Sequence, residues 1–166
     1  MNEASHTNGF LLAEPGSLIG VSDWMTITQA MVDRFAEATF DDDPMHIDPE
    51  WARAETPYGG TIAFGFLTMS LLTHMLHTVQ PRDRRSHVAT AGYYLNYGFN
   101  RLRLISPVPT GSAVRGRFEL VDRRTDERGR SQMTIGATVE IENGEKPALV
   151  AEWLSVWVPP KGHQGA

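Results

Sequence analysis

The longest run of apolar positions lies between Ile62 and Val79. Apolar side chains recur almost all round a helix drawn through this run, which predicts a helix that other parts of the chain bury. Thr and His residues interrupt the run, so it falls short of the apolar length that a membrane span requires. At about 1.5 Å per residue the helix would extend roughly 25 Å, the width of a small sheet.

Downstream of this helix the chain changes to segments rich in Val, Ile, Tyr, Phe and Thr that are separated by turn signals. This pattern predicts strands. The expected strands are residues 91–104, 113–123, 131–141 and 148–158, with a further short strand at 23–27. Their short connections favour antiparallel pairing, and a sheet with one apolar face needs a cover. The expected fold class is therefore α+β, with a curled antiparallel sheet around the central helix.

Two shorter helices are expected before the central one. Thr28 is a good N-cap for a helix that ends near Thr39. Asp48 followed by Pro49, at the first helical position, signals the second start. A Pro and two Gly residues from position 57 onward end this second helix.

Length, composition and charge limit the possible classes. A chain of 166 residues with 41 % hydrophobic composition suits one domain, expected at residues 17–158 between an N-terminal tail, 1–16, and a disordered C-terminal tail, 159–166. The lack of cysteine excludes disulfides and thiolate chemistry. A formal charge of −5 argues against nucleic-acid binding. The polar N-terminus does not resemble a secretory signal, so we expect a cytoplasmic protein with no membrane partner.

Carboxylates and an imidazole gather in residues 40–48. His46 near Asp41 predicts an acid/base pair that works around neutral pH. The same composition is also typical of a solvated turn whose carboxylates cap the next helix. A metal site is a third alternative, but Met45 occupies a ligand position and no glycine follows Asp43, unlike a calcium loop. We expect no metal.

Three motifs, in order along the chain, carry a resemblance to a known family. Residues 35–49, FAEATFDDDPMHIDP, and residues 60–67, GTIAFGFL, resemble the hydratase motif of the MaoC-like hotdog dehydratases, the (R)-specific enoyl-CoA hydratases. Residues 96–103, NYGFNRLR, and the turn at 107–111, PVPTG, are similar to the subgroup related to nodulation protein N. The resemblance spans about residues 17–158. It implies a hotdog fold, which agrees with the helix and sheet derived independently.

The resemblance also implies a mechanism. Asp41 and His46 would hold one water, remove its proton as it attacks the β-carbon of a trans-2-enoyl thioester, and return a proton to the α-carbon. The amide of Gly65, at the start of the central helix, would stabilise the charge that gathers on the thioester oxygen. A glycine there also permits close helix–sheet packing, and the two roles can coexist. No metal or redox cofactor is implied.

Further substrate contacts follow from the same resemblance. Asn100 and Tyr97 would orient the acyl thioester, and Thr73 matches a serine position near the family's pocket. The alternatives are ordinary strand packing for Asn100 and Tyr97, and a hydroxyl bond to its own helix for Thr73. The basic run of Arg82, Arg84 and Arg85 would meet coenzyme A phosphates or form a solvated loop.

The sequence departs from the family pattern at three positions around the site. Phe40 stands where a glycine is frequent, Asp43 where Asn or Gln is frequent, and Phe64 where a histidine precedes the helix glycine. Phe64 thereby becomes an apolar candidate for substrate contact. Any step that the usual histidine assists must be carried out by another group or be lost.

The expected function is reversible hydration of a trans-2-enoyl thioester of coenzyme A or a carrier protein to the (R)-3-hydroxyacyl thioester. An exposed edge of the sheet predicts a homodimer, or a heterodimer with a second hotdog chain. Two alternatives stay open: a hotdog acyl-CoA thioesterase, and a non-catalytic acyl-binding subunit of a heterodimer.

Overall fold

The computed structural model describes residues 13–79 and 92–160. The expected arginine contacts of Arg82, Arg84 and Arg85 lie outside the described residues. In chain order the elements are β1 (Leu18–Val21), β2 (Met25–Thr26), α2 (Gln29–Thr39), α3 (Pro44–Ile47), α4 (Pro49–Glu55), α5 (Gly65–Val79), β3 (Tyr93–Leu104), β4 (Ala113–Thr125), β5 (Ser131–Ile141) and β6 (Leu149–Val158).

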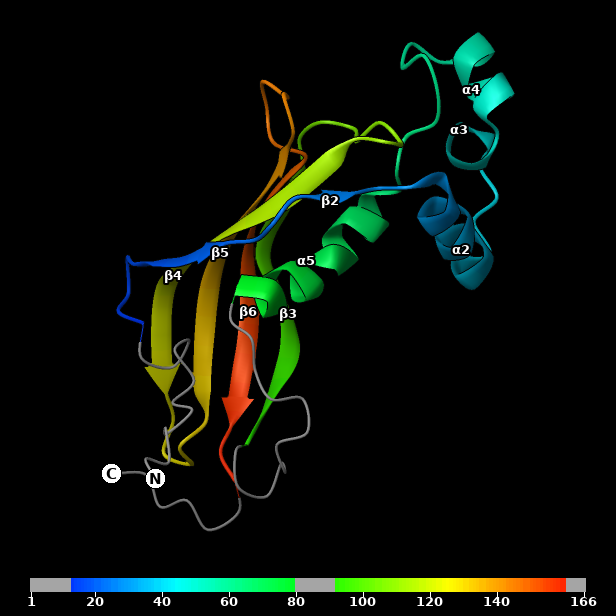
Figure 1. Ribbon diagram of the computed structural model, residues 1–166. Coiled ribbons are helices and arrows are strands. Elements are labelled where there is room, and N and C mark those ends of the chain that lie inside the picture. Colours follow the sequence, from blue (N-terminus) through cyan, green and yellow to red (C-terminus); the bar gives the residue numbers. More distant parts are fainter. Residues whose placement is uncertain (1–12, 80–91, 161–166) are drawn as a thin grey trace, which may run out of the picture.

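The strands form one antiparallel sheet with α5 against one face (Figure 1). The strand order is β1-β4-β5-β6-β3, and β2 also pairs with β4. Consecutive strands β4, β5 and β6 are neighbours, whereas β3 comes before them in sequence and pairs with β6 at the far edge. The predicted α+β architecture is confirmed. The helices α2, α3 and α4 lie together beyond the end of the sheet, near the start of α5 (Figure 1).

The core lies between α5 and the sheet. From Ser131 to Glu140, strand β5 alternates between buried and half-buried residues, as its sequence predicts for a half-buried strand. Phe118 of β4 and Met75 of α5 are among the fully buried side chains. Helix and sheet approach closely at Gly116, where a Cβ atom would lie 2.6 Å from the Phe118 ring and 3.1 Å from Met75 Cβ. A side chain at this position would push α5 off the sheet.

The central helix starts at Gly65, three residues later than the apolar run suggests. Ile62 instead forms an antiparallel bridge with Pro109, and Ala63 N donates to Val108 O at 2.8 Å. This short pairing satisfies backbone groups that a helix would otherwise use. It also ties the segment before α5 to the turn between β3 and β4, which fixes where the helix begins.

Two small elements were not expected from the sequence. β1 has four residues and pairs with β4 across a register shift. α3 is a single turn between the two predicted short helices, with Asp43 as its N-cap. Both are too short to produce a readable hydrophobic period.

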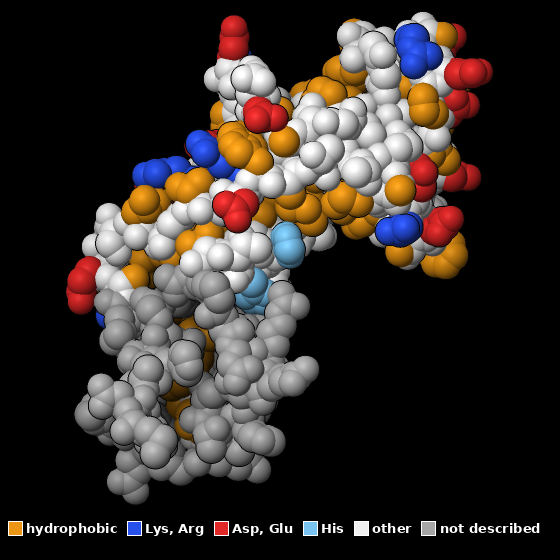
Figure 2. All heavy atoms as spheres, viewed as in Figure 1, with side chains coloured by type: hydrophobic (Ala, Val, Ile, Leu, Met, Phe, Trp, Pro, Cys, Tyr) orange, Lys and Arg blue, Asp and Glu red, His pale blue; other side chains and the backbone are white. Residues whose placement is uncertain are grey.

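The outer face of α5 differs from the prediction. The apolar residues all round the helix predicted burial on every side, but Phe66 is 68 % exposed, and Ser70 and His74 are also exposed. Figure 2 shows histidine side chains at the surface over α5. The expectation of a fully wrapped helix is wrong for the single chain, because the sheet covers only one side. No helix among the described residues is long and apolar enough to cross a membrane.

Adjacent residues of β4 provide a matched test of this packing. Leu120 is fully buried beneath α5, whereas Val121 is 47 % exposed. Leu120→Ala should lower the free energy of unfolding by about 2–5 kcal/mol through the lost contacts and the cavity left behind. Val121→Ala should lower it by less than about 1 kcal/mol. Urea denaturation of both variants measures the difference, and equal losses would contradict the assignment of faces.

Candidate active site

The acidic turn between α2 and α3 is built by local caps. Thr28 caps α2 by accepting from Met31 N, and the helix ends as predicted at Thr39. Phe40 follows in the left-handed region, with φ at 58°, and its side chain is 92 % exposed. Such a φ is unfavourable for a residue with a Cβ, which explains why glycine suits this position.

Two carboxylates of the turn act as helix caps. Asp43 accepts from Met45 N at 2.9 Å and starts α3, and Asp48 accepts from the N–H groups of Glu50 and Trp51 at 3.0 Å and starts α4. The capping interpretation therefore holds for Asp43 and Asp48. Asp41 differs, because among residues 13–79 and 92–160 its Oδ1 meets only Asp43 N, at 3.5 Å, and its side chain is exposed. The carboxylate of Asp41 is thus available for another partner.

His46 is held in a defined orientation. Its Nδ1 lies 2.6 Å from the carbonyl oxygen of Ile62. A carbonyl only accepts, so the neutral ring carries its proton on Nδ1 and leaves a lone pair on Nε2. The ring also packs on Phe64, with centroids 3.9 Å apart and planes inclined by 37°. Since Phe64 is buried, it forms a fixed wall behind the imidazole.

A cavity of about 240 Å³ brings His46 and the start of α5 together. It is lined by His46, Gly65 and Thr68 on one side and by Leu104, Pro107 and Val108 on the other, among further residues. Gly65 is the first residue of α5, so its N–H has no acceptor within the helix. The helix dipole adds positive potential at this point. The imidazole of His46 and the N-terminus of α5 therefore border one cavity.

Gly65 also lies close to the sheet. A Cβ atom here would collide with Leu104 Cδ1, which is the far end of a side chain that is 53 % exposed and has room to move. The packing role therefore stays a prediction. The catalytic role of the Gly65 amide also stays a prediction.

The other predicted site residues lie elsewhere in the single chain. Among the described residues, the lining of the cavity does not include Asp41, Phe64, Thr73, Tyr97 or Asn100. Phe64 touches the site by packing on His46. Tyr97 and Asn100 are exposed on the edge strand β3, and Thr73 is half-buried on α5. The structure therefore groups His46, Phe64 and Gly65, and leaves the roles of the others as predictions.

Sequence reasoning missed Gln29, whose amide reaches the backbone oxygen of His46 at 2.8 Å. A glutamine after a helix cap carries no local signal of such a contact, because the two residues are 17 positions apart. No group of three or more His, Asp or Glu side chains suited to a metal ion occurs within residues 13–79 and 92–160.

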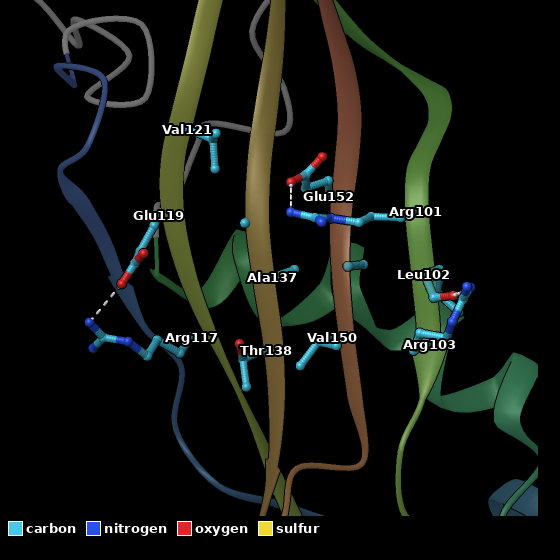
Figure 3. A pocket seen from close by; sticks show the side chains of 12 residues that line it. Arg101, Leu102, Arg103, Arg117, Glu119, Val121, Ala137, Thr138, Val150 and Glu152 are labelled. Atoms are coloured by element: carbon cyan, nitrogen blue, oxygen red, sulfur yellow. Dashed lines mark hydrogen bonds and ion pairs between the residues drawn. The ribbon is translucent and has the colours of Figure 1, made fainter.

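A larger groove, of about 600 Å³, lies on the opposite face of the sheet. In Figure 3, α5 lies behind the strands while the side chains of the groove point forward. Arg101 pairs with Glu152, and Arg117 pairs with Glu119 at 2.9 Å. Its described lining contains no imidazole and no helix N-terminus. The cavity beside His46 is therefore the better candidate for the active site, although the groove has the larger volume.

Comparison with known proteins agrees with this arrangement. A model of the MaoC-like domain matches residues 11–143. Nodulation protein N of Rhizobium meliloti is 48 % identical over 85 % of this chain and 84 % of its own length. The chain belongs to the MaoC-like domain family. Both the predicted family and the likeness to nodulation protein N are confirmed.

A second relative and a solved structure agree with this assignment to the MaoC-like family. The 3-hydroxyacyl-thioester dehydratase Z of Mycobacterium tuberculosis is 44 % identical over 89 % of this chain and 93 % of its own. The (R)-hydratase from A. caviae involved in PHA biosynthesis superposes with a TM-score of 0.68 at 23 % identity, covering 88 % of this chain and 97 % of that one. The predicted hotdog fold is confirmed.

The orientation of His46 is open to direct measurement. Because Ile62 O accepts from Nδ1, nitrogen-15 NMR of the neutral imidazole should show His46 in the Nδ1–H form, with Nε2 unprotonated. The exposed His74 of α5 serves as an internal comparison and should exchange between both tautomers. A protonated Nε2 on neutral His46 would contradict the hydrogen bond to Ile62 and remove the proposed proton acceptor.

Proposed function

We propose that this MaoC-like chain is a hydro-lyase that adds water reversibly to a trans-2-enoyl thioester and yields the (R)-3-hydroxyacyl thioester. One observation carries the proposal: His46 and the N-terminus of α5 at Gly65 open onto the same cavity. The relative named as a 3-hydroxyacyl-thioester dehydratase supports the same reaction class. We propose the (R) configuration for the product because a solved structure with the same fold is named an (R)-hydratase. The similarity to that structure itself shows only that the two proteins share a fold.

His46 is the proposed proton-transfer group. In hydration its Nε2 lone pair accepts a proton from the water whose oxygen bonds to the β-carbon, and the Asp41/His46 pair then returns a proton to the α-carbon, which restores both groups. Dehydration runs the same transfers in reverse: the pair removes the α-proton, and the protonated Nε2 donates to the departing hydroxyl. The hydrogen bond of Nδ1 to Ile62 O fixes which nitrogen performs this step. Phe64 contributes by limiting rotation of the ring rather than by exchanging protons.

Asp41 is the proposed second water ligand. In the described part of the chain its carboxylate makes only a long contact, to Asp43 N within the turn, in contrast to the capping carboxylates of Asp43 and Asp48. Hydrogen bonds of catalytic groups are often long in a free enzyme and shorten in the substrate complex. We propose that Asp41 and His46 then share one water molecule.

The Gly65 N–H is the proposed donor to the thioester oxygen. As water adds to the β-carbon, negative charge moves to this oxygen, and a fixed donor that meets the charge lowers the barrier. Leu104 and Val108 supply apolar walls beside this donor. The substrate is proposed to be an acyl thioester of coenzyme A or of a carrier protein. Its parts farther from the reacting carbons are proposed to contact Thr73, Tyr97 and Asn100.

We also propose that the chain forms a homodimer through β3. This strand is the edge of the sheet and pairs only with β6 among the described residues. It exposes apolar side chains, with Leu95 50 % and Tyr97 66 % exposed. An unpaired apolar edge is a template for pairing with a second chain. A second hotdog chain of different sequence is the alternative partner.

Hydration of trans-2-enoyl-CoA of short and long chain length tests the reaction. Wild type should remove the conjugated enoyl absorbance without releasing free thiol. Asp41→Asn and His46→Gln should each lower kcat by about 10²- to 10⁴-fold, because each removes a proton-transfer or water-holding group. His74→Gln, on the outer face of α5, is the matched control and should keep the wild-type rate.

The same assay separates the alternative functions. Release of free coenzyme A would identify a thioesterase. Binding of the thioester without turnover, until a second hotdog chain is added, would identify a non-catalytic subunit. Wild-type rates in both Asp41→Asn and His46→Gln would remove the mechanism even if hydration occurs.

Sedimentation measures the proposed dimer. Leu95→Asp places a charge on the exposed face of β3 and should shift the protein from dimer to monomer, because burying an unpaired carboxylate opposes pairing. Val121→Asp, at a similarly exposed position on β4, is the control and should leave the dimer intact. Dissociation of both variants, or of neither, would argue against β3 as the interface.

A further inference from the structure

The side chain of Gln29 joins three parts of the chain that surround His46. Its Nε2 donates to the carbonyl oxygen of His46 and to Asp33 Oδ1, each at 2.8 Å. Its Oε1 accepts from Thr61 Oγ1 at 2.6 Å. The bond to Asp33 is local to α2, whereas the other two reach α3 and the segment before α5.

The orientation of this amide is determined by its partners. Both partners of Nε2, a carbonyl and a carboxylate, are acceptors, so a flipped amide would set oxygen against oxygen. Thr61 is buried, and its hydroxyl proton completes the set. In this rotamer both the nitrogen and the oxygen of the Gln29 amide have hydrogen-bond partners, so these bonds hold the side chain in one orientation.

The two distant bonds of Gln29 reach both ends of the contact that orients the imidazole. One bond holds the backbone of His46. The other holds Thr61, the residue directly before Ile62, whose carbonyl accepts from His46 Nδ1. Thr61 O in turn accepts from Thr110 N at 2.9 Å, which anchors this segment to the turn before β4. Movement of either end changes the direction of Nε2.

We infer that Gln29, acting with Thr61, is a positioning residue for His46, and this inference rests on the proposed function. Gln29 is not among the described residues that line the cavity, so it acts through the imidazole and not on the substrate. Its removal leaves the general base in place and lets the base rotate. A misplacement of about 1 Å can reduce the rate by about 10²-fold.

Paired variants test the inference. Gln29→Met keeps the length of the side chain and removes all three bonds, and Thr61→Val removes only the hydroxyl. Both should lower kcat by about 10-fold or more, with KM changed by less than about twofold, because transition-state geometry is affected more than binding. Thr61→Ser keeps the hydroxyl and should restore most of the rate. Nitrogen-15 NMR should show mixed tautomers of His46 in Gln29→Met and Thr61→Val.

A double variant separates positioning from general stabilisation. In the His46→Gln background there is no imidazole to orient, so adding Gln29→Met should not reduce the residual rate further. Thr78→Val removes a hydroxyl bond of 2.7 Å on α5 and controls for loss of such a bond elsewhere. It should change neither kcat nor the tautomer of His46.

Three outcomes would overturn the inference. One is an unchanged kcat and an unchanged tautomer in Gln29→Met and Thr61→Val. Another is an equal loss of rate when Gln29→Met is added to His46→Gln, which would show a merely structural role. The third is failure of Thr61→Ser to restore the rate. If wild type does not hydrate enoyl thioesters, the proposed function fails and the tautomer measurement alone decides the positioning role. If Gln29→Met does not fold, the two Thr61 variants decide it.

Discussion

The hydrogen bond between His46 Nδ1 and the carbonyl oxygen of Ile62 is the contact on which the site depends. Ile62 belongs to no long strand, but it bridges Pro109 and therefore takes its position from the sheet. The helix α5 starts only three residues later. A single bond thus relates the imidazole of α3 to the sheet and to the amide at the helix N-terminus. Because a carbonyl cannot donate, the same bond also determines which ring nitrogen can accept a proton.

The replacement of the family's histidine by Phe64 changes how this imidazole is supported. A second imidazole could share a proton with the first, whereas a phenyl ring can only pack. Phe64 lies between His46 and Phe35, with ring centroids 3.9 and 5.2 Å away. This apolar wall restricts rotation of the His46 ring. Phe64 therefore has a structural role of its own in holding His46.

The extent to which the sequence predicts the structure depends on the distance between interacting residues. Strand 131–141 has the predicted bounds because alternation is a local signal. The caps at Thr28 and Asp48 are local as well. The start of α5 was placed too early because an apolar run does not distinguish a bridge from a helix. The role of Gln29 was missed because its partners lie 17 and 32 residues away. Long-range polar contacts leave no periodic pattern.

The edge strand β3 carries two of the predicted site residues that lie outside the cavity, Tyr97 and Asn100, together with exposed apolar side chains. Leu104 lines the cavity and is 53 % exposed, and it ends the same edge strand that exposes Leu95 and Tyr97. Between Tyr97 and Leu104 the exposed side chains of β3 are polar or charged: Asn100, Arg101 and Arg103. Burial of apolar surface contributes about 25 cal/mol per Å². A second chain along β3, as proposed above, would gain this energy at Leu95 and Tyr97. Helix α5 is also incompletely covered, at Phe66, because one sheet can bury only one side of an apolar helix.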